Sequence, residues 1–394
     1  MRAARAGIAM TAMAACLALS SITGDAHKPI TSPYTFNEDV FPIVRERCGA
    51  CHVAGGVGPM SLMTHAEAVP WGESLRAELM AGHMPPWLVE SPAGRFRNVQ
   101  GLTGRELNVL LTWASGGTPI GDPAKSPEAL PLKRDWPLGA PDLVLPLPNE
   151  VVIPADVQER EVEFTVPTGG ATPRWLRAVD LLPGTASIVR GATITVKTAA
   201  TPGAASRAEA LVSLWLPGDH PVPLDGNTAF ALPAGAELVV RVRYRKTWEY
   251  ENRAMSDRSS IGLYFAPDPA TALNALQLAA PVTPDPAASS TFTTPVAEPL
   301  RAVAIYAEPS VTDTAIKVTA IRPDQSREEL IAFRPQAGWA RRYWFREPIA
   351  LPRGTRIEVQ SRADAALLPP SAMRPPRSGD PAPVRLTLNV VPAD

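Results

Sequence analysis

Residues 232–244 read Leu-Pro-Ala-Gly-Ala-Glu-Leu-Val-Val-Arg-Val-Arg-Tyr, a turn followed by a strand-like run. Residues 232–235 contain the Pro and Gly of a turn, and from 237 to 244 apolar residues recur at every second position, as in a half-buried strand. A similar Leu-Pro-Arg-Gly turn at 351–354 precedes another strand-like run, which hints at a duplicated unit. The stretch therefore predicts β-structure built from short strands and Pro-Gly turns.

Short runs rich in Val, Leu, Ile and Thr continue this pattern on both sides, from about residue 120 to the C-terminus. The 44 prolines are about twice the usual share, and many of them stand in turns between these runs. The predicted strands are residues 142–147, 161–166, 175–181, 187–196, 211–216, 237–244, 260–265, 300–307, 315–321, 340–345, 356–361 and 384–391. A Pro/Ala/Ser-rich linker at about 281–290 divides them into two sets. We expect two consecutive antiparallel sandwiches of jelly-roll type.

The charge balance and the N-terminus indicate a soluble exported protein. The 394 residues have a formal net charge of -1, which argues against a basic surface for nucleic acid. Residues 1–26 resemble a cleavable signal peptide, with two early arginines, an apolar run over 7–19 and small residues before the end. A lipid anchor on Cys16 is less consistent, because the apolar run continues past it. No later segment reaches the roughly 18 apolar residues that span a bilayer, so we expect a periplasmic protein.

The chain contains one motif with specific chemistry, Cys48-Gly-Ala-Cys51-His52. In an exported chain, C-x-x-C-H is the attachment signature of a c-type haem. The two thiols form thioether bonds to the porphyrin, and the histidine is the proximal iron ligand. A disulfide, a redox C-x-x-C pair and half of a zinc site are the alternatives. Zinc would need a second Cys/His pair, and no fourth cysteine exists.

Helical patterns surround this motif. Residues 36–44 and 71–79 each carry three large apolar residues four apart, and 103–117 combines a Thr-x-x-Glu capping box, an apolar stripe and a terminal Gly-Gly. The order helix, C-x-x-C-H, helix, helix predicts a small class I cytochrome c.

The distal iron ligand is predicted to be Met84. It heads Met-Pro-Pro-Trp, and the prolines hold an extended backbone that can present a thioether to iron. His83 is the alternative, whereas Met60 is assigned to packing around the haem, and Met63 and Met80 to the core. His-Met ligation leaves no open position on iron and suits electron transfer.

The chain resembles bacterial exported proteins in which a monohaem cytochrome c precedes a domain like the copper type II, ascorbate-dependent monooxygenases of the peptidylglycine α-hydroxylating type. The matching motifs are Cys48–His52, Gly58-Pro59-Met60, Met84–Trp87 and residues 113–122, 141–145, 257–264 and 339–357. The resemblance implies two jelly-roll-like subdomains, each with one copper ion.

The histidines of that family are missing here. Arg190 stands where the resemblance implies a His-His pair, Arg243 where it implies a third histidine, and Glu308 near an expected His-x-His. His220 is the last histidine, and it is assigned to a surface turn. Because copper of this type needs several imidazoles, we do not expect copper as a cofactor. Arg190 and Arg243 are interpreted either as binding an anion or carboxylate or as solvated charges.

These observations predict a multidomain chain, with a small all-α class I cytochrome c domain followed by all-β tandem jelly-roll-like sandwiches. The expected parts are a signal peptide at 1–26, a cytochrome c domain at 27–135, and degenerate monooxygenase-like sandwiches at 136–285 and 286–394. The leading hypothesis is haem-based electron transfer with a redox protein as donor or acceptor, and with the β-region used for docking or structure. A copper- and haem-dependent monooxygenase is the alternative; a haem enzyme with an open iron site and a ligand-binding subunit are further classes.

Overall fold

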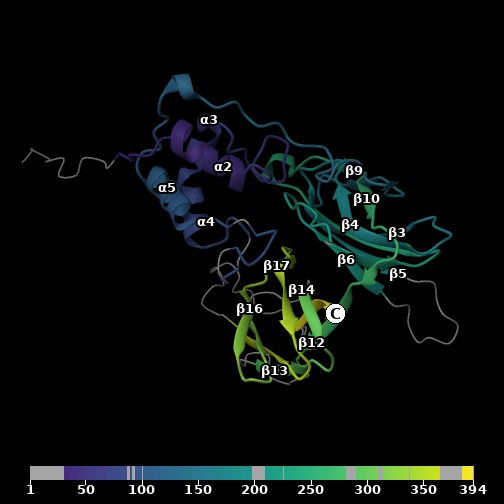
Figure 1. Cartoon of the computed structure of the whole chain (residues 1–394). Coiled ribbons are helices and arrows are strands. Elements are labelled where there is room, and N and C mark those ends of the chain that lie inside the picture. Colours follow the sequence, from purple (N-terminus) through teal and green to yellow (C-terminus); the bar gives the residue numbers. More distant parts are fainter. Residues whose placement is uncertain are drawn as a thin grey trace, which may run out of the picture.

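The computed structural model describes most of the chain after the predicted signal peptide (Figure 1). The described residues are 31–86, 89–90, 94–99, 101–197, 209–224, 226–280, 290–308, 314–336, 338–363 and 384–393. The predicted signal peptide and most of the predicted linker at 281–290 lie outside these residues. Among the described helices, none combines the length and apolar character needed to cross a bilayer.

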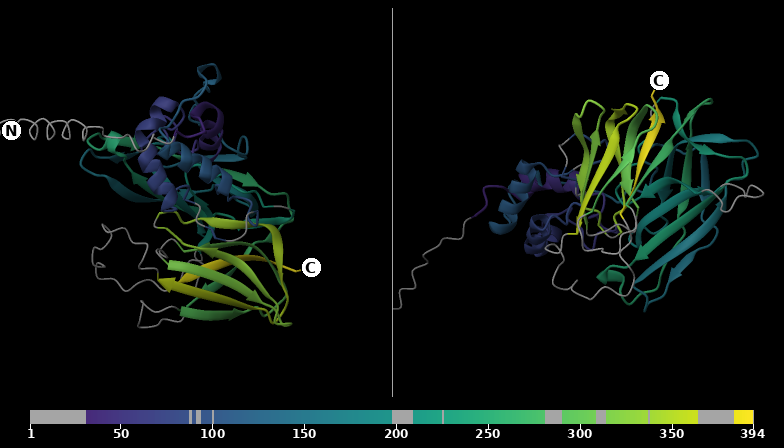
Figure 2. Two further views of the ribbon diagram at one scale, coloured as in Figure 1. Left: turned by 90° about the vertical axis from the view of Figure 1, so that its left-hand side faces the viewer. Right: turned by 90° about the horizontal axis from the view of Figure 1, so that it is seen from below.

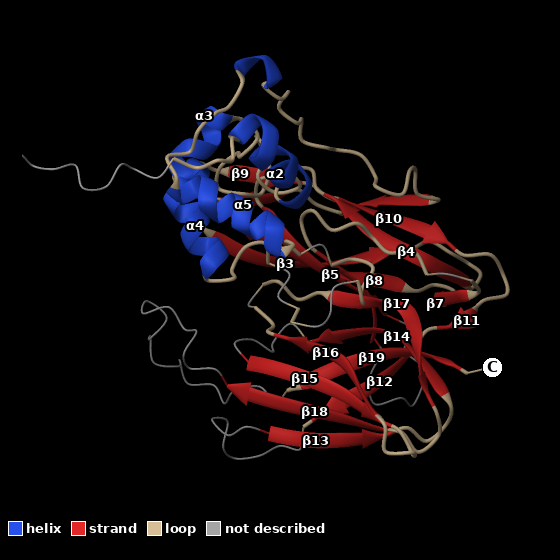
Figure 3. Ribbon diagram, turned by 60° about the vertical axis from the view of Figure 1, so that its left-hand side comes forward, coloured by secondary structure: helices blue, strands red, loops and turns tan. Residues whose placement is uncertain are grey.

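Apart from one short 3-10 helix within the first sandwich, the helices gather in the N-terminal part of the chain (Figure 3). They are η1 (Phe36–Val40), α2 (Phe41–Arg47), α3 (His65–Ala68), η2 (Val69–Trp71), α4 (Gly72–Met80), α5 (Gly104–Ser115) and η3 (Pro123–Lys125). Helix α5 begins with the capping box, in which Thr103 accepts from the Glu106 amide and Glu106 accepts from the Thr103 amide. Phe36, Leu110 and Trp113 are fully buried at the centre of a small apolar core.

The first sandwich follows the helices. Its strands are β1 (Leu143–Pro146), β2 (Val151–Ile153), β3 (Glu159–Pro167), β4 (Arg174–Leu182), β5 (Val189–Lys197), β6 (Glu209–Trp215), β7 (Thr228–Leu232), β8 (Glu237–Arg245), β9 (Met255–Asp257), β10 (Ser260–Phe265) and β11 (Thr271–Ala272), with η4 (Trp248–Tyr250) between β8 and β9. One sheet has the order β1-β10-β4-β7-β11, and the other has β3-β8-β5-β6. Strands β2 and β9 form a separate pair.

The second sandwich has two four-stranded sheets (Figure 2). Its strands are β12 (Asn274–Ala279), β13 (Ser290–Pro295), β14 (Leu300–Ala307), β15 (Thr314–Ile321), β16 (Arg327–Phe333), β17 (Arg342–Leu351), β18 (Arg356–Ala363) and β19 (Arg385–Pro392). The orders are β12-β19-β14-β17 and β13-β18-β15-β16, so β17 and β16 are edge strands of their sheets. Strand β12, which precedes the expected linker, pairs with β19 of this sandwich.

The turns at 232–235 and 351–354 adopt the same local conformation. Each lies between two strands, β7 and β8 in one case and β17 and β18 in the other. Both glycines, Gly235 and Gly354, have a positive φ that residues with a side chain rarely adopt. The amides of Ala236 and Thr355 close the two turns on Pro233 and Pro352. The turns therefore use Pro and Gly for the same steric reasons in each sandwich.

A segment between α4 and α5 leaves the helices and lies along the second sandwich. We call residues 89–90 and 94–98 the strap. Val89 and Phe96 form β-bridges with Phe333 of β16 and Phe345 of β17, one on each edge strand. Backbone bonds from Glu90 to β16 and from Arg97 to β17 extend this pairing. The strap therefore covers edges that would otherwise expose unpaired backbone groups.

The prediction of a small all-α class I cytochrome c domain is wrong. Strands make up most of the regular structure, and α5, the longest described helix, has only 12 residues. The residues expected to link two helices of a compact domain instead pair with sheets more than 230 residues further along the chain. Helical periodicity indicates which face of a segment is apolar. It does not indicate where a connection without such a pattern lies, and the prediction failed for this reason.

The two sandwiches share a packed junction. The apolar core of the first sandwich includes Val303, Ala304 and Trp344 from the second. Arg342 of β17 donates hydrogen bonds to the carbonyls of Leu211 and Val212 on β6. Apolar packing and buried hydrogen bonds therefore join the sandwiches directly.

Candidate functional site

The C-x-x-C-H motif forms one tight turn at the end of α2. Cys48 caps this helix and donates its amide to the Val44 carbonyl at 2.9 Å. The Cys48 carbonyl then accepts from the amides of Cys51 and His52, at 3.0 and 2.8 Å. A Cβ at Gly49 would lie 2.6 Å from the Arg45 carbonyl oxygen, so this tight turn requires glycine. The two thiols and the imidazole are thereby fixed within five residues.

The His52 ring is held in one tautomer. Its Nδ1 lies 3.2 Å from the Met60 carbonyl oxygen, and a carbonyl can only accept a hydrogen bond. Nδ1 therefore carries the proton, and in the neutral ring Nε2 keeps a free lone pair. Burial lowers the pKa of His52, although its bond to Met60 opposes this shift. A neutral imidazole with a free Nε2 is the form that binds a metal.

Gly58 allows the His52 ring to pack against the following loop. A Cβ at this position would lie 2.7 Å from Nδ1 and 2.9 Å from the Cys51 carbonyl oxygen. The amide of Gly58 also donates to that carbonyl at 2.8 Å. The loop thus follows the ring closely, which brings the Met60 carbonyl within reach of Nδ1.

Both cysteines are free thiols, so the disulfide alternative is absent from the described structure. Burial raises the pKa of Cys48 to about 12 and that of Cys51 to about 11. Cys48 packs against the helical core. Cys51 faces the first sandwich instead, where its Sγ lies 3.5 Å from the Pro217 carbonyl oxygen. A Cβ on Gly218 would touch both Ala50 and this sulfur, at 2.8 and 3.4 Å.

Met84 and His83 lie in the turn that follows α4. The backbone amides of both residues point to the Glu78 carbonyl, at 3.4 Å for Met84 and 3.0 Å for His83. The His83 ring contacts the Glu78 carboxylate at 3.0 Å, with 45% of its side chain exposed. Met84 is half-buried. The contacts described for Met84 do not join it to His52, so its role as distal ligand stays a prediction.

The other candidate methionines divide into three environments. Met63 is buried in the helical core, as predicted. Met60 packs at the edge of that core and supplies the carbonyl that orients His52. The assignment of Met80 to the core is wrong, because this residue is 64% exposed. Met80 is the last residue of α4 and lies off the helix face that carries the buried Leu75 and Leu79.

Arg190 and Arg243 bind backbone carbonyls of neighbouring parts of the chain. Arg190 donates to Val57, in the loop between His52 and Met60, and to Arg245 on the adjacent strand. Arg243 donates to Gly338 in the loop before β17. Burial lowers the pKa of Arg190 to about 10 and also lowers that of Arg243. The sequence predicted either an anion or carboxylate partner or a solvated charge for these arginines. The structure instead shows both guanidinium groups bound to backbone carbonyls.

The donor set at the motif fits a covalent haem. Two free thiols and one imidazole with a free Nε2 stand in a single turn, which is the arrangement that thioether attachment and iron ligation require. Across the part of the chain that the structure describes, no group of three or more His, Cys, Asp or Glu side chains is placed to hold a metal ion by itself. If a haem is bound here, the motif would supply one iron ligand, His52, and a distal ligand would have to come from elsewhere, with Met84 as the predicted residue.

Comparisons with known proteins add little to this picture. No family model and no curated protein matches the chain. Among solved structures, an allantoicase shares 9% identity over 59% of this chain and 77% of its own, with a TM-score of 0.18. A fucolectin from striped bass (Morone saxatilis) serum shares 10% identity over 62% and 85%, with a TM-score of 0.16. The tandem CBM22 domain of Paenibacillus barcinonensis Xyn10C shares 10% over 58% and 82%, with a TM-score of 0.17. At these scores the likeness carries no argument about function.

Proposed function

We propose that this protein is an electron-transfer protein that carries one haem, bound covalently through Cys48 and Cys51, with His52 as the proximal iron ligand. The observation that carries the proposal is the bond from His52 Nδ1 to the Met60 carbonyl, beside two free thiols in the same turn. Such a bond orients a ligating imidazole and makes its other nitrogen more basic. A structural histidine in a core would not need two free thiols at this spacing.

The bound haem would supply a one-electron couple between ferric and ferrous iron. The chain's own contribution is to position the group and exclude water. Burial of His52 favours its neutral form, and the Met60 carbonyl fixes the proton on Nδ1. Cys48 packs on the helical core, and Cys51 lies under Pro217 and Gly218 of the first sandwich. The sandwich thus covers one side of the motif, which supports a structural role for the β-region.

We further propose that Met84 is the distal ligand and that the protein acts in the periplasm with a redox protein as donor or acceptor. Met84 follows α4 by four residues, in the same turn as His83. Location in the periplasm rests on the signal-like residues 1–26, because haem is attached to C-x-x-C-H chains after export. The resemblance to haem–monooxygenase fusions supports the same function for the N-terminal part, and the missing copper-ligand histidines argue against copper chemistry in the β-region.

The decisive experiment is an optical spectrum of the purified, processed protein, ferric and then ferrous, before and after addition of carbon monoxide. We expect a covalently bound, low-spin haem that shows a thioether–iron charge-transfer band and does not respond to the gas. A preparation without covalent haem would overturn the proposal. A high-spin spectrum that shifts at once with carbon monoxide would instead indicate an open iron site and a haem enzyme.

A matched pair of methionine variants tests the distal ligand. Met84→Ala should remove the charge-transfer band and open the iron to carbon monoxide. Met80→Ala removes the same side chain four residues away, where it is 64% exposed, and should leave the spectrum unchanged. If both variants keep the charge-transfer band, Met84 is not the distal ligand. A bis-histidine spectrum in the unmodified protein would assign His83 in its place.

A further inference from the structure

The loop that follows β6 lies against the C-x-x-C-H motif, and we call residues 216–219 the covering loop. The Pro217 carbonyl oxygen lies 3.5 Å from the Cys51 Sγ. Gly218 has a positive φ, and a Cβ at this position would come within 2.8 Å of the Ala50 Cβ and within 3.4 Å of that sulfur. The covering loop therefore contacts the motif directly, and Cys51 is half-buried.

An ion pair with the second sandwich holds the covering loop at its end. Asp219 Oδ1 lies 2.5 Å from Nη2 of Arg341, the residue before β17. Only 2% of the Arg341 side chain and 15% of the Asp219 side chain are exposed. Salt screens a pair buried in this way much less than it screens a surface pair. The Asp219 amide also donates to the Leu216 carbonyl at 3.0 Å, so the paired residue and the start of the covering loop are joined.

The strap fixes the guanidinium of Arg341 from a second side. Its Nη1 donates to the Asn98 carbonyl at 2.7 Å. The Asn98 side chain donates to the Arg342 carbonyl at 2.8 Å and accepts from the Trp344 amide at 3.2 Å, and both of these residues belong to β17. Because the donors of a guanidinium are held in a rigid plane, the strap sets the direction in which Arg341 reaches Asp219.

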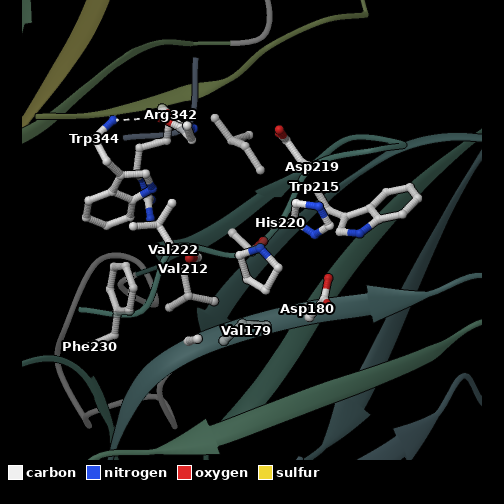
Figure 4. Close-up of a pocket in the computed structure, with 15 residues that line it drawn as sticks. Val179, Asp180, Val212, Trp215, Asp219, His220, Val222, Phe230, Arg342 and Trp344 are labelled. Atoms are coloured by element: carbon white, nitrogen blue, oxygen red, sulfur yellow. Dashed lines mark hydrogen bonds between the residues drawn. The ribbon is translucent and has the colours of Figure 1, made fainter. Parts of the chain in front are cut away.

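Figure 4 shows the region where the residues after β6 meet the second sandwich. One small pocket there is lined by Asp219 and His220, by Arg342 and Trp344 of β17 and by Asp180 of β4. His220 is exposed, as expected for its predicted place in a surface turn. Burial raises the pKa of Asp219 to about 6, and its arginine partner opposes this shift. At pH 8 the Asp219 carboxylate is therefore ionised and able to form the ion pair.

We propose that Asp219 and Arg341 form a latch that keeps the covering loop on Cys51, so that the second sandwich and the strap govern access to this thiol. Both are positioning residues, because they act on Cys51 through the covering loop. Cys48 packs against the helical core, so its access should not depend on the latch. The role of Cys51 in haem attachment rests on the proposed function, whereas the latch is a property of the chain itself.

The test measures access to Cys51 with two thiol reagents of different size. The chain that follows the predicted signal peptide would be produced in the cytoplasm, where haem is not attached, so that both thiols stay free. It would be labelled at pH 8 with a small maleimide and with a maleimide on a polyethylene glycol chain, and tandem mass spectrometry would assign the label to each cysteine. Asp219 and Arg341 also shift the pKa of Cys51, in opposite directions. The ratio of the two labelling rates cancels the thiolate fraction, which both reagents require, and therefore reports steric access.

Arg341→Gln removes the ion pair and should raise the ratio of bulky to small reagent rates at Cys51 by at least about tenfold, because opening of the loop then no longer breaks a buried pair. The ratio at Cys48 should stay unchanged, whereas general unfolding would raise both ratios. Arg341→Lys keeps a charge for the ion pair and should restore most of the protection. Arg241→Gln is the matched control, because it breaks an exposed ion pair with Glu163 and should change neither ratio.

An unchanged ratio at Cys51 in Arg341→Gln, or an equal rise at Cys48 and Cys51, would overturn the latch. If circular dichroism shows that Arg341→Gln does not fold, Asp219→Asn, which leaves the arginine bonded to the strap, is held to the same criteria. Covalent haem is scored separately on the exported protein. Its absence would overturn the proposed function and leave the latch standing, whereas unchanged labelling would refute the latch and leave haem attachment standing.

Discussion

Replacing Phe96 with alanine tests whether the strap is part of the second sandwich. Phe96 is 3% exposed, and its ring centre lies 5.6 Å from that of Tyr343 and 5.4 Å from that of Phe345. Removing a buried phenylalanine costs roughly 3–5 kcal/mol, and lost aromatic pairs contribute to this cost. We therefore expect Phe96→Ala to lower the free energy of unfolding by about 4 kcal/mol.

Urea unfolding followed by tryptophan fluorescence and circular dichroism measures this loss. Val152→Ala is the matched control, because Val152 is 50% exposed on β2 and its truncation should change stability by less than about 0.5 kcal/mol. A loss of under about 1 kcal/mol in Phe96→Ala would refute the reasoning, since an exposed linker of a separate helical domain would behave in that way.

Limited proteolysis with trypsin gives an independent readout of the same variant. Arg95 and Arg97 are tryptic sites within the strap, and their Nε atoms donate to the carbonyls of Leu330 and Phe345. A docked strap resists the protease because cleavage requires local opening. Phe96→Ala should be cut faster at both arginines. Equal cleavage rates in the two proteins would mean that the strap is already detached in solution.

Three further substitutions test the site and its supports. Gly58→Ala should displace the loop on His52 and destabilise the site proposed to hold haem, whereas Gly101→Ala, where a Cβ meets nothing within 4 Å, should not; equal melting temperatures of the two variants would contradict this. Because burial raises the pKa of Asp180 to about 7, the folded state holds an extra proton and loses stability as pH rises from about 4 to 7. Asp180→Asn should therefore raise stability relative to the unmodified protein at pH 8 but not at pH 4, as measured by melting at both values. Thr103→Ala should cost about 1 kcal/mol in urea unfolding through loss of the cap on α5, and an unchanged midpoint would argue against that cap.

The sequence located most strands because their signals are local. Residues 237–244 were expected as a strand, and β8 covers them; residues 260–265 coincide with β10. Strand β16 was missed, since Glu328 and Glu329 interrupt its apolar pattern. The structure shows why they are tolerated: β16 is an edge strand, where Glu328 pairs with Arg95 and Glu329 with Lys317. Edge positions accept charges that a central strand would exclude.

The candidate site likewise has features that are local in the sequence and features that are not. Cys48, Cys51 and His52 were identified from their spacing, and the structure holds all three in one turn. The Met60 carbonyl could not be predicted as the partner of His52, because a backbone oxygen leaves no mark in the sequence. The junction between the sandwiches was equally hidden, since Arg342 and the β6 carbonyls that it binds are far apart in the chain.

Arg190, at one of the positions where copper ligands were expected, joins the β-region to the loop that follows the C-x-x-C-H motif. Arg190 bonds the Val57 carbonyl, Val57 lies in the loop that ends at Met60, and Met60 orients His52. A guanidinium suits this task because its rigid donors can bind several carbonyls at once, and Arg190 also bonds the Arg245 carbonyl of its own sandwich. The first sandwich thereby braces the loop whose Met60 carbonyl orients the His52 ring. This contact gives the β-region a structural role beside the C-x-x-C-H motif.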